Sequence, residues 1–140
     1  MKPVLQTKFD AEGNCATACW ASLLGVPIDY IPDLNVQQQF SAEAKFAARL
    51  GLAIYSVADV GSGSWDCPGD PQSDVVYMAS GPGARGVSHR VLMRDGVMVH
   101  DPHVDQTGLE KVERLILVLG DVRDARRTLV AHGGVALEAP

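Results

Sequence analysis

Residues 14–25 read NCATACWASLLG, and this stretch contributes most to the fold prediction. Asn14 is a residue type that favours the N-cap position, and Gly25, followed by Pro27, is a typical helix stop. The residues between them are small or apolar, and none of them is charged. We therefore predict a helix over residues 15–24 that has little solvent-facing surface and runs through the centre of the domain.

Beyond this helix the pattern changes from helical to strand-like. Ser41 is expected to open a second helix, which Gly51 ends. Short apolar runs then predict five strands, and a final charged stretch predicts a surface helix. The expected strands are residues 53–57, 75–79, 89–93, 97–100 and 112–119, and the expected last helix is residues 121–131. Helices first and strands afterwards indicate the α+β class.

The composition indicates one compact domain over residues 1–140. The chain is 46% hydrophobic and 21% charged, which suits a single core of good size. A net charge of −5 gives no general attraction to phosphate backbones or anionic lipids, so nucleic acid and membranes are not expected partners. Without a signal-peptide pattern, and with an odd count of three cysteines, the chain is expected in the cytoplasm.

A β-hairpin is predicted to bring a histidine and an aspartate together. With a three-residue turn at residues 94–96, His89 would lie directly opposite Asp101, with both side chains on the same face. A two-residue turn at residues 95–96 is the competing register. It would place His89 opposite Pro102 and turn Asp101 to the other face.

The cysteines differ in their expected roles. Cys15 lies in the first turn of the predicted helix, where the helix dipole and unpaired N–H groups favour thiolate over thiol. Cys19, one turn further along, is expected in the core. Cys67 falls in a loop rich in Gly, Ser and Pro and is expected to be incidental. Cys15 is therefore the candidate nucleophile.

Three short segments together resemble the papain-like cysteine peptidases. These are the run from Gln6 to Gly25 that contains Asn14-Cys15-Ala16, the run Ser88-His89-Arg90-Val91, and the run Val99-His100-Asp101-Pro102. The chain looks most similar to the branch that includes the bacteriocin-leader-processing peptidases and small stand-alone relatives in bacteria and phages. The resemblance implies an N-terminal central helix that carries the nucleophile and packs on an antiparallel sheet.

The same resemblance implies roles for four residues. Cys15 would attack, His89 would move the proton, Asp101 would hold the imidazole, and Gln6 would donate to the oxyanion. The implied function is a cysteine peptidase or amidohydrolase that cleaves peptide or amide bonds through an acyl-enzyme, without a cofactor. The substrate would be a peptide or protein, and the location would be the host cytoplasm if a phage encodes the chain.

Two other functions stay open on the sequence. One is a catalytically silent papain-like domain that binds a protein, as an accessory of a phage or mobile element. The other is a metal-binding module. Its candidate ligands are Cys15, Cys19, His89, His100 and His103. The spacing argues against metal, because the cysteines lie on one helix without a second cysteine pair. Separately, His100 and His103 are expected to be surface residues.

Overall fold

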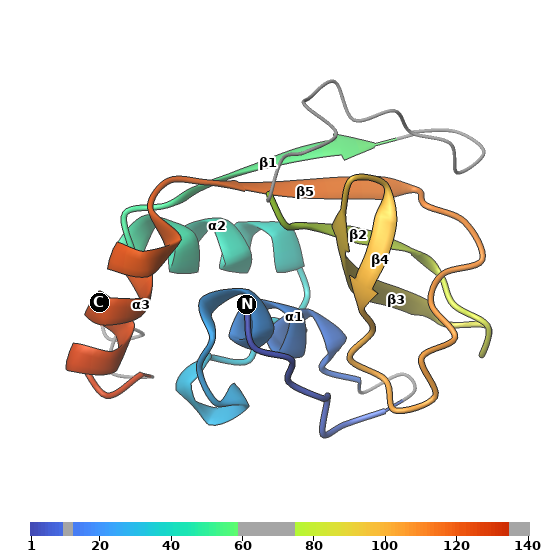
Figure 1. The fold of residues 1–140 in the computed structure, drawn as a ribbon, viewed down its shortest axis with the longest axis horizontal. Helices are drawn as coiled ribbons and strands as arrows, with labels where there is room; N and C mark the ends of the chain where they lie inside the picture. Colours follow the sequence, from blue (N-terminus) through green and yellow to red (C-terminus); the bar gives the residue numbers. More distant parts are fainter. Residues whose placement is uncertain (10–12, 59–74, 135–140) are drawn as a thin grey trace.

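The computed structural model describes residues 1–9, 13–58 and 75–134, and they form an α+β fold (Figure 1). The helices are α1 (Cys15–Leu24), α2 (Gln39–Arg49) and α3 (Val122–Ala131), with a short 3-10 turn η2 (Ile28–Tyr30). The strands are β1 (Ala53–Ala58), β2 (Tyr77–Pro82), β3 (Ser88–Arg94), β4 (Val97–His100) and β5 (Arg114–Leu119). The α+β class is therefore confirmed.

The five strands form one antiparallel sheet in the order β1-β5-β2-β3-β4. Helices α1 and α2 lie on one face of this sheet, and the main core fills the space between them (Figure 1). Because side chains alternate along a strand, Leu92 enters this core whereas its neighbour Val91 joins a smaller apolar cluster with Tyr77, Ala79 and Leu115.

Helix α1 has the predicted bounds and is buried along its whole length after Cys15. Gly25 ends it in the left-handed conformation at φ 72°, and the Gly25 N–H donates back to the helix, as the sequence predicted. The N-terminal segment runs along α1, since the N–H of Lys2 donates to the Ser22 carbonyl and the N–H of Val4 to the Ser22 hydroxyl. A helix covered on all sides is a rigid support for the residue at its start.

Helix α2 begins two residues before the predicted Ser41, after Gln38 in a left-handed conformation. Its buried side chains are Glu43, Phe46 and Ala47, so the inward face includes a carboxylate. Among the strands, β4 has the predicted bounds, and the others agree to within a few residues. Cys67 lies outside the described residues.

The β3–β4 hairpin differs from both predicted registers. Its turn has two residues, Asp95 and Gly96, both with positive φ, because that geometry matches the strand twist. Arg94 pairs with Val97, so the predicted three-residue turn is wrong.

A β-bulge then restores the placement of His89 and Asp101 on one side of the hairpin, which the two-residue turn alone would have lost. Met93 pairs with Met98, but Leu92 pairs with His100, so one extra residue is inserted on β4. The insertion shifts the alternation by one position. Asp101 therefore returns to the side of the hairpin that carries His89.

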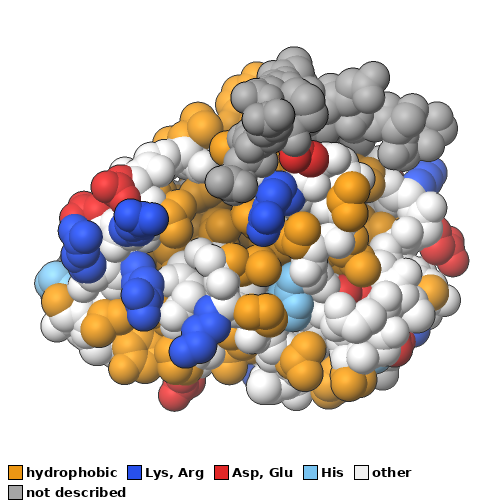
Figure 2. All heavy atoms as spheres, in the orientation of Figure 1, with side chains coloured by type: hydrophobic (Ala, Val, Ile, Leu, Met, Phe, Trp, Pro, Cys, Tyr) orange, Lys and Arg blue, Asp and Glu red, His pale blue; other side chains and the backbone are white. Residues whose placement is uncertain are grey.

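Lys and Arg side chains gather on the side of the molecule where α3 lies (Figure 2). Helix α3 carries the exposed Arg123, Arg126 and Arg127, and Arg126 lies beside Gly25 at the C-terminal end of α1. This basic surface is therefore at the opposite end of α1 from Cys15. Within the described ranges, no helix combines the length and apolar character needed to cross a membrane.

Candidate active site

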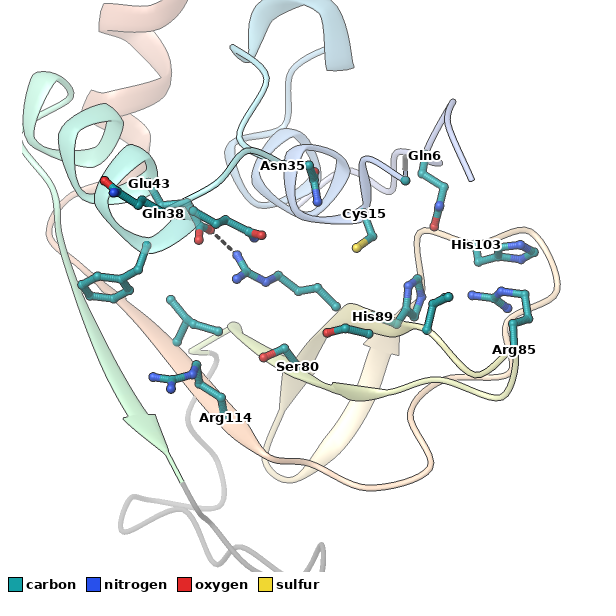
Figure 3. A pocket seen from close by; sticks show the side chains of 17 residues that line it. Gln6, Cys15, Asn35, Gln38, Glu43, Ser80, Arg85, His89, His103 and Arg114 are labelled. Carbon is teal, nitrogen blue, oxygen red and sulfur yellow. Dashed lines mark hydrogen bonds and ion pairs between the residues drawn. The ribbon is translucent and has the colours of Figure 1, made fainter. Parts of the chain in front are cut away.

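A pocket of about 710 Å³ opens beside the first turn of α1 (Figure 3). Its walls come from the segment before α1, the starts of α1 and α2, strands β2, β3 and β5, the β2–β3 loop and the loop after β4. The residues that carry its chemistry are Gln6, Cys15, Glu43, Arg85, His89, Arg90, His103 and Arg114. Three of the four predicted site residues, Gln6, Cys15 and His89, thus line one cavity.

Cys15 is the first residue of α1, and its side chain is half-buried at the pocket. Asn14 occupies the predicted N-cap position, but its side chain makes no capping bond. Instead, Asn14 Oδ1 accepts from the N–H groups of Thr7 and Lys8, at 3.0 and 2.9 Å. Asn14 therefore holds residues 1–9, the lead-in segment, in place, and its side chain does not occupy the N–H groups of the first helical turn.

His89 and Asp101 form the predicted pair. His89 Nε2 lies 2.6 Å from Asp101 Oδ1, and the side chains are 3% and 0% exposed. The bond to the carboxylate uses Nε2, which leaves Nδ1 as the ring nitrogen available to Cys15. Figure 3 shows the His89 ring and the Cys15 sulfur turned toward each other across the pocket.

The carboxylate of Asp101 is held from three directions. Besides His89, the N–H of His103 donates to Oδ1 at 2.8 Å and the N–H of Gly108 donates to Oδ2 at 2.7 Å. Burial opposes ionisation, but these three bonds outweigh it and lower the pKa of Asp101. Asp101 is therefore an ionised and immobile acceptor for the imidazole.

The same network acts on the thiol and the imidazole. Burial opposes ionisation of Cys15, but the hydrogen bond and charge of His89, aided by Arg90, outweigh it and lower the thiol pKa. Burial also disfavours the protonated ring of His89, yet the bonds to Asp101 and Cys15 raise its pKa to about 9. Each group stabilises the charged form of the other, which favours a thiolate–imidazolium pair.

The peptide group of Arg90 joins α1 to β3. Its N–H stabilises the thiolate of Cys15, and its carbonyl accepts from Cys19 Sγ at 3.5 Å. Cys19 is fully buried, and burial raises its pKa well above the ordinary value. Cys19 is thus a core residue, as expected, and it helps to set the position of α1 on the strand.

Gln6 lines the pocket and is 7% exposed. Its backbone N–H donates to the Pro102 carbonyl at 2.9 Å, which ties the lead-in segment to the end of the hairpin. Its side-chain Nε2 donates to the Lys8 carbonyl at 2.8 Å, and Oε1 is buried without a hydrogen-bond partner. In this orientation one of the two amide protons is already used, so oxyanion binding would depend on the other.

The pocket wall contains a buried ion pair that was not predicted from the sequence. Arg90 Nη1 donates to Glu43 Oε1, and Trp20 Nε1 donates to the same oxygen at 2.7 Å. A signal for Glu43 was present, because it lies at helical spacing from Phe46 and Ala47, which face the core. For Arg90 no local signal existed, since its partner comes from a distant helix.

The two other candidate histidines are not both surface residues. His100 is 5% exposed and its Nε2 bonds to the Val4 carbonyl at 2.8 Å, so the expected surface position is wrong. His103 is half-buried at the pocket, where its ring packs edge-on against Phe9 and Nδ1 lies 2.9 Å from Asp105. In the part of the chain that the structure describes, no group of three Cys, His, Asp or Glu side chains could hold a metal ion.

These pKa shifts predict a characteristic pH dependence. Alkylation of Cys15 by iodoacetamide is expected to reach half its plateau rate at a lower pH than alkylation of a free cysteine, because the thiol pKa is lowered. A second change is expected near pH 9, where His89 loses its proton and the thiolate loses its imidazolium partner. The rate of Cys15 alkylation at each pH is measured by peptide mass spectrometry of stopped reactions. A profile identical to that of free cysteine would contradict the ion pair.

No family model, no curated protein and no solved structure matches this chain.

Proposed function

We propose that this chain is a cysteine-nucleophile hydrolase of the papain-like kind, which cleaves peptide or amide bonds through an acyl-enzyme. One observation carries the proposal. Three groups lie in contact in one row: the thiol at the start of a buried helix, the imidazole on β3 and the carboxylate after β4. His89 Nε2 is bound to Asp101, and Nδ1 is left for Cys15.

The order of contacts fits acyl transfer. The thiolate of Cys15 adds to the carbonyl carbon, and the carbonyl electrons move to oxygen. His89 gives its proton to the leaving amine as the C–N bond breaks. Water then attacks the thioester while His89 accepts a proton, and the C–S bond breaks to return the thiolate. Asp101 fixes the ring orientation throughout and stays ionised.

The oxyanion needs donors close to Cys15. The first turn of α1 offers backbone N–H groups at the positive end of the helix, and the Asn14 side chain does not cap them. One of them, the N–H of Thr17, already donates to Asn35 Oδ1 at 3.3 Å. The Cys15 N–H is the nearest such donor by sequence. Gln6 would add a second donor through its remaining amide proton.

Replacing His89 by glutamine should abolish the enhanced reactivity of Cys15. In a Cys67→Ser background, which removes a thiol outside the described residues, iodoacetamide should alkylate Cys15 at pH 6.5 about tenfold faster than it alkylates free cysteine. The His89→Gln variant should react no faster than free cysteine, because glutamine supplies no positive charge. Buried Cys19 serves as the internal unreactive thiol.

A matched control is His132→Gln, which removes an exposed histidine just after α3 and should leave the rate unchanged. If Cys15 of the unaltered chain reacts no faster than free cysteine, the hydrolase proposal fails and a silent binding domain becomes the better description.

A further inference from the structure

Among the lining residues that the structure describes, every charged side chain but one lies beside an oppositely charged partner. Arg85 forms an ion pair with Asp105 at 2.8 Å, and Arg90 pairs with Glu43. His89 is matched by Asp101. Within the described part of the lining, one further charge remains, and it is a guanidinium.

That guanidinium is Arg114, at the start of β5. Within residues 1–9, 13–58 and 75–134, no carboxylate lies within ion-pair distance of Arg114. Its Nη1 donates to the neutral hydroxyl of Ser56 at 2.5 Å, and its side chain is exposed to the pocket opening. Arg114 therefore has positive charge to offer a ligand.

The sheet positions Arg114 within the same cavity as the nucleophile. Arg114 lies directly opposite Ser80 of β2, and both side chains line the pocket. Figure 3 shows the two residues on the sheet side of the cavity, with Cys15 on the helix side. The described lining also includes neutral amides, such as those of Gln38 and Gln39 at the start of α2.

We propose that Arg114 is a specificity residue that binds a carboxylate of the substrate, so that the enzyme prefers acidic peptides. The inference rests on the proposed function, because it assigns a substrate class to the same pocket. A guanidinium without a countercharge favours a carboxylate over the neutral amide of the same shape. The preference runs against the net charge of −5, which by itself would disfavour acidic substrates.

The test uses short peptide vinyl sulfones, whose vinyl carbon adds to the Cys15 thiolate, in the Cys67→Ser background. Glu and Gln are compared at each position of otherwise identical probes, and the second-order labelling rate of Cys15 is measured by mass spectrometry. At one position the Glu probe should react about fivefold to tenfold faster than the Gln probe. In Arg114→Gln this ratio should fall to about one, and in Arg114→Lys it should stay above one.

Two variants separate charge recognition from a structural role. Ser56→Ala removes the hydrogen bond of Arg114 but keeps its charge, so it should preserve the Glu preference. Arg123→Gln changes the net charge equally, on α3 at the far end of α1, and should also preserve it. Peptides with free or amidated C-termini, used as competitors of the labelling, distinguish a terminal carboxylate from an acidic side chain.

The outcomes also separate the two proposals. Suppose that labelling of Cys15 depends on His89. If the Glu and Gln probes then react at equal rates, or if the Glu-to-Gln rate ratio is unchanged in Arg114→Gln, the inference about Arg114 is overturned and the hydrolase proposal stands. If none of the probes labels Cys15, the chain lacks the proposed function, and the proposed preference for acidic peptides is overturned as well.

Discussion

Asp101→Asn is expected to lower the rate of the proposed peptide hydrolysis by roughly 10²- to 10³-fold. Both carboxylate oxygens act as acceptors, Oδ1 from His89 and His103 and Oδ2 from Gly108. An amide has one acceptor oxygen, so its NH₂ group must face one of these donors. Either His89 is forced into the wrong tautomer or the loop around Gly108 is displaced.

The loss of charge adds to this effect. Asp101 is one of the groups that raise the pKa of His89 to about 9. Without it, the imidazole loses its proton at a lower pH, and the thiolate of Cys15 loses part of its stabilisation. The measurement is hydrolysis of a peptide that the vinyl sulfone panel identifies, together with the pH dependence of Cys15 alkylation.

A suitable control for Asp101→Asn is Asp124→Asn, which removes an exposed carboxylate on α3 and should change the rate by less than about twofold. Circular dichroism of both variants checks that the fold is retained. An Asp101→Asn protein that is folded and hydrolyses the peptide at the original rate would exclude Asp101 from the orientation of His89.

Glu43→Gln is expected to lower the free energy of unfolding by about 3–5 kcal/mol. Glu43 is 1% exposed, and its partner Arg90 is 7% exposed. Removal of the carboxylate charge leaves a buried guanidinium without a countercharge, whereas the glutamine oxygen can still accept from Trp20 Nε1. A loss of this size is a large share of the 5–15 kcal/mol typical of small domains.

Urea unfolding followed by tryptophan fluorescence measures the loss. The exposed Glu110→Gln is the matched control and should shift the free energy by no more than about 0.5 kcal/mol. The double variant Glu43→Leu/Arg90→Met removes both charges and should recover most of the stability. A loss below about 1 kcal/mol in Glu43→Gln would mean that water reaches Arg90 and compensates its charge.

The hairpin illustrates how a correct prediction followed from an incorrect register. Turn chemistry at Asp95 and Gly96 is compatible with two registers, and only the three-residue turn was predicted to pair His89 with Asp101. The protein uses the other turn and adds a bulge, with the result that the same two side chains meet. No local turn signal indicates a bulge, because the register of β4 also depends on contacts such as that of His100 with Val4.

The sequence by itself determined the α+β class, the bounds of α1 and β4, and the candidate trio of Cys15, His89 and Asp101. Helix caps, stop signals and apolar periodicity act over a few residues, so they can be read from a single chain. Only the tertiary structure decided that Asn14 holds the lead-in segment and that Glu43 neutralises Arg90. Those choices depend on partners far apart in the chain, where burial makes a missing hydrogen bond or countercharge costly.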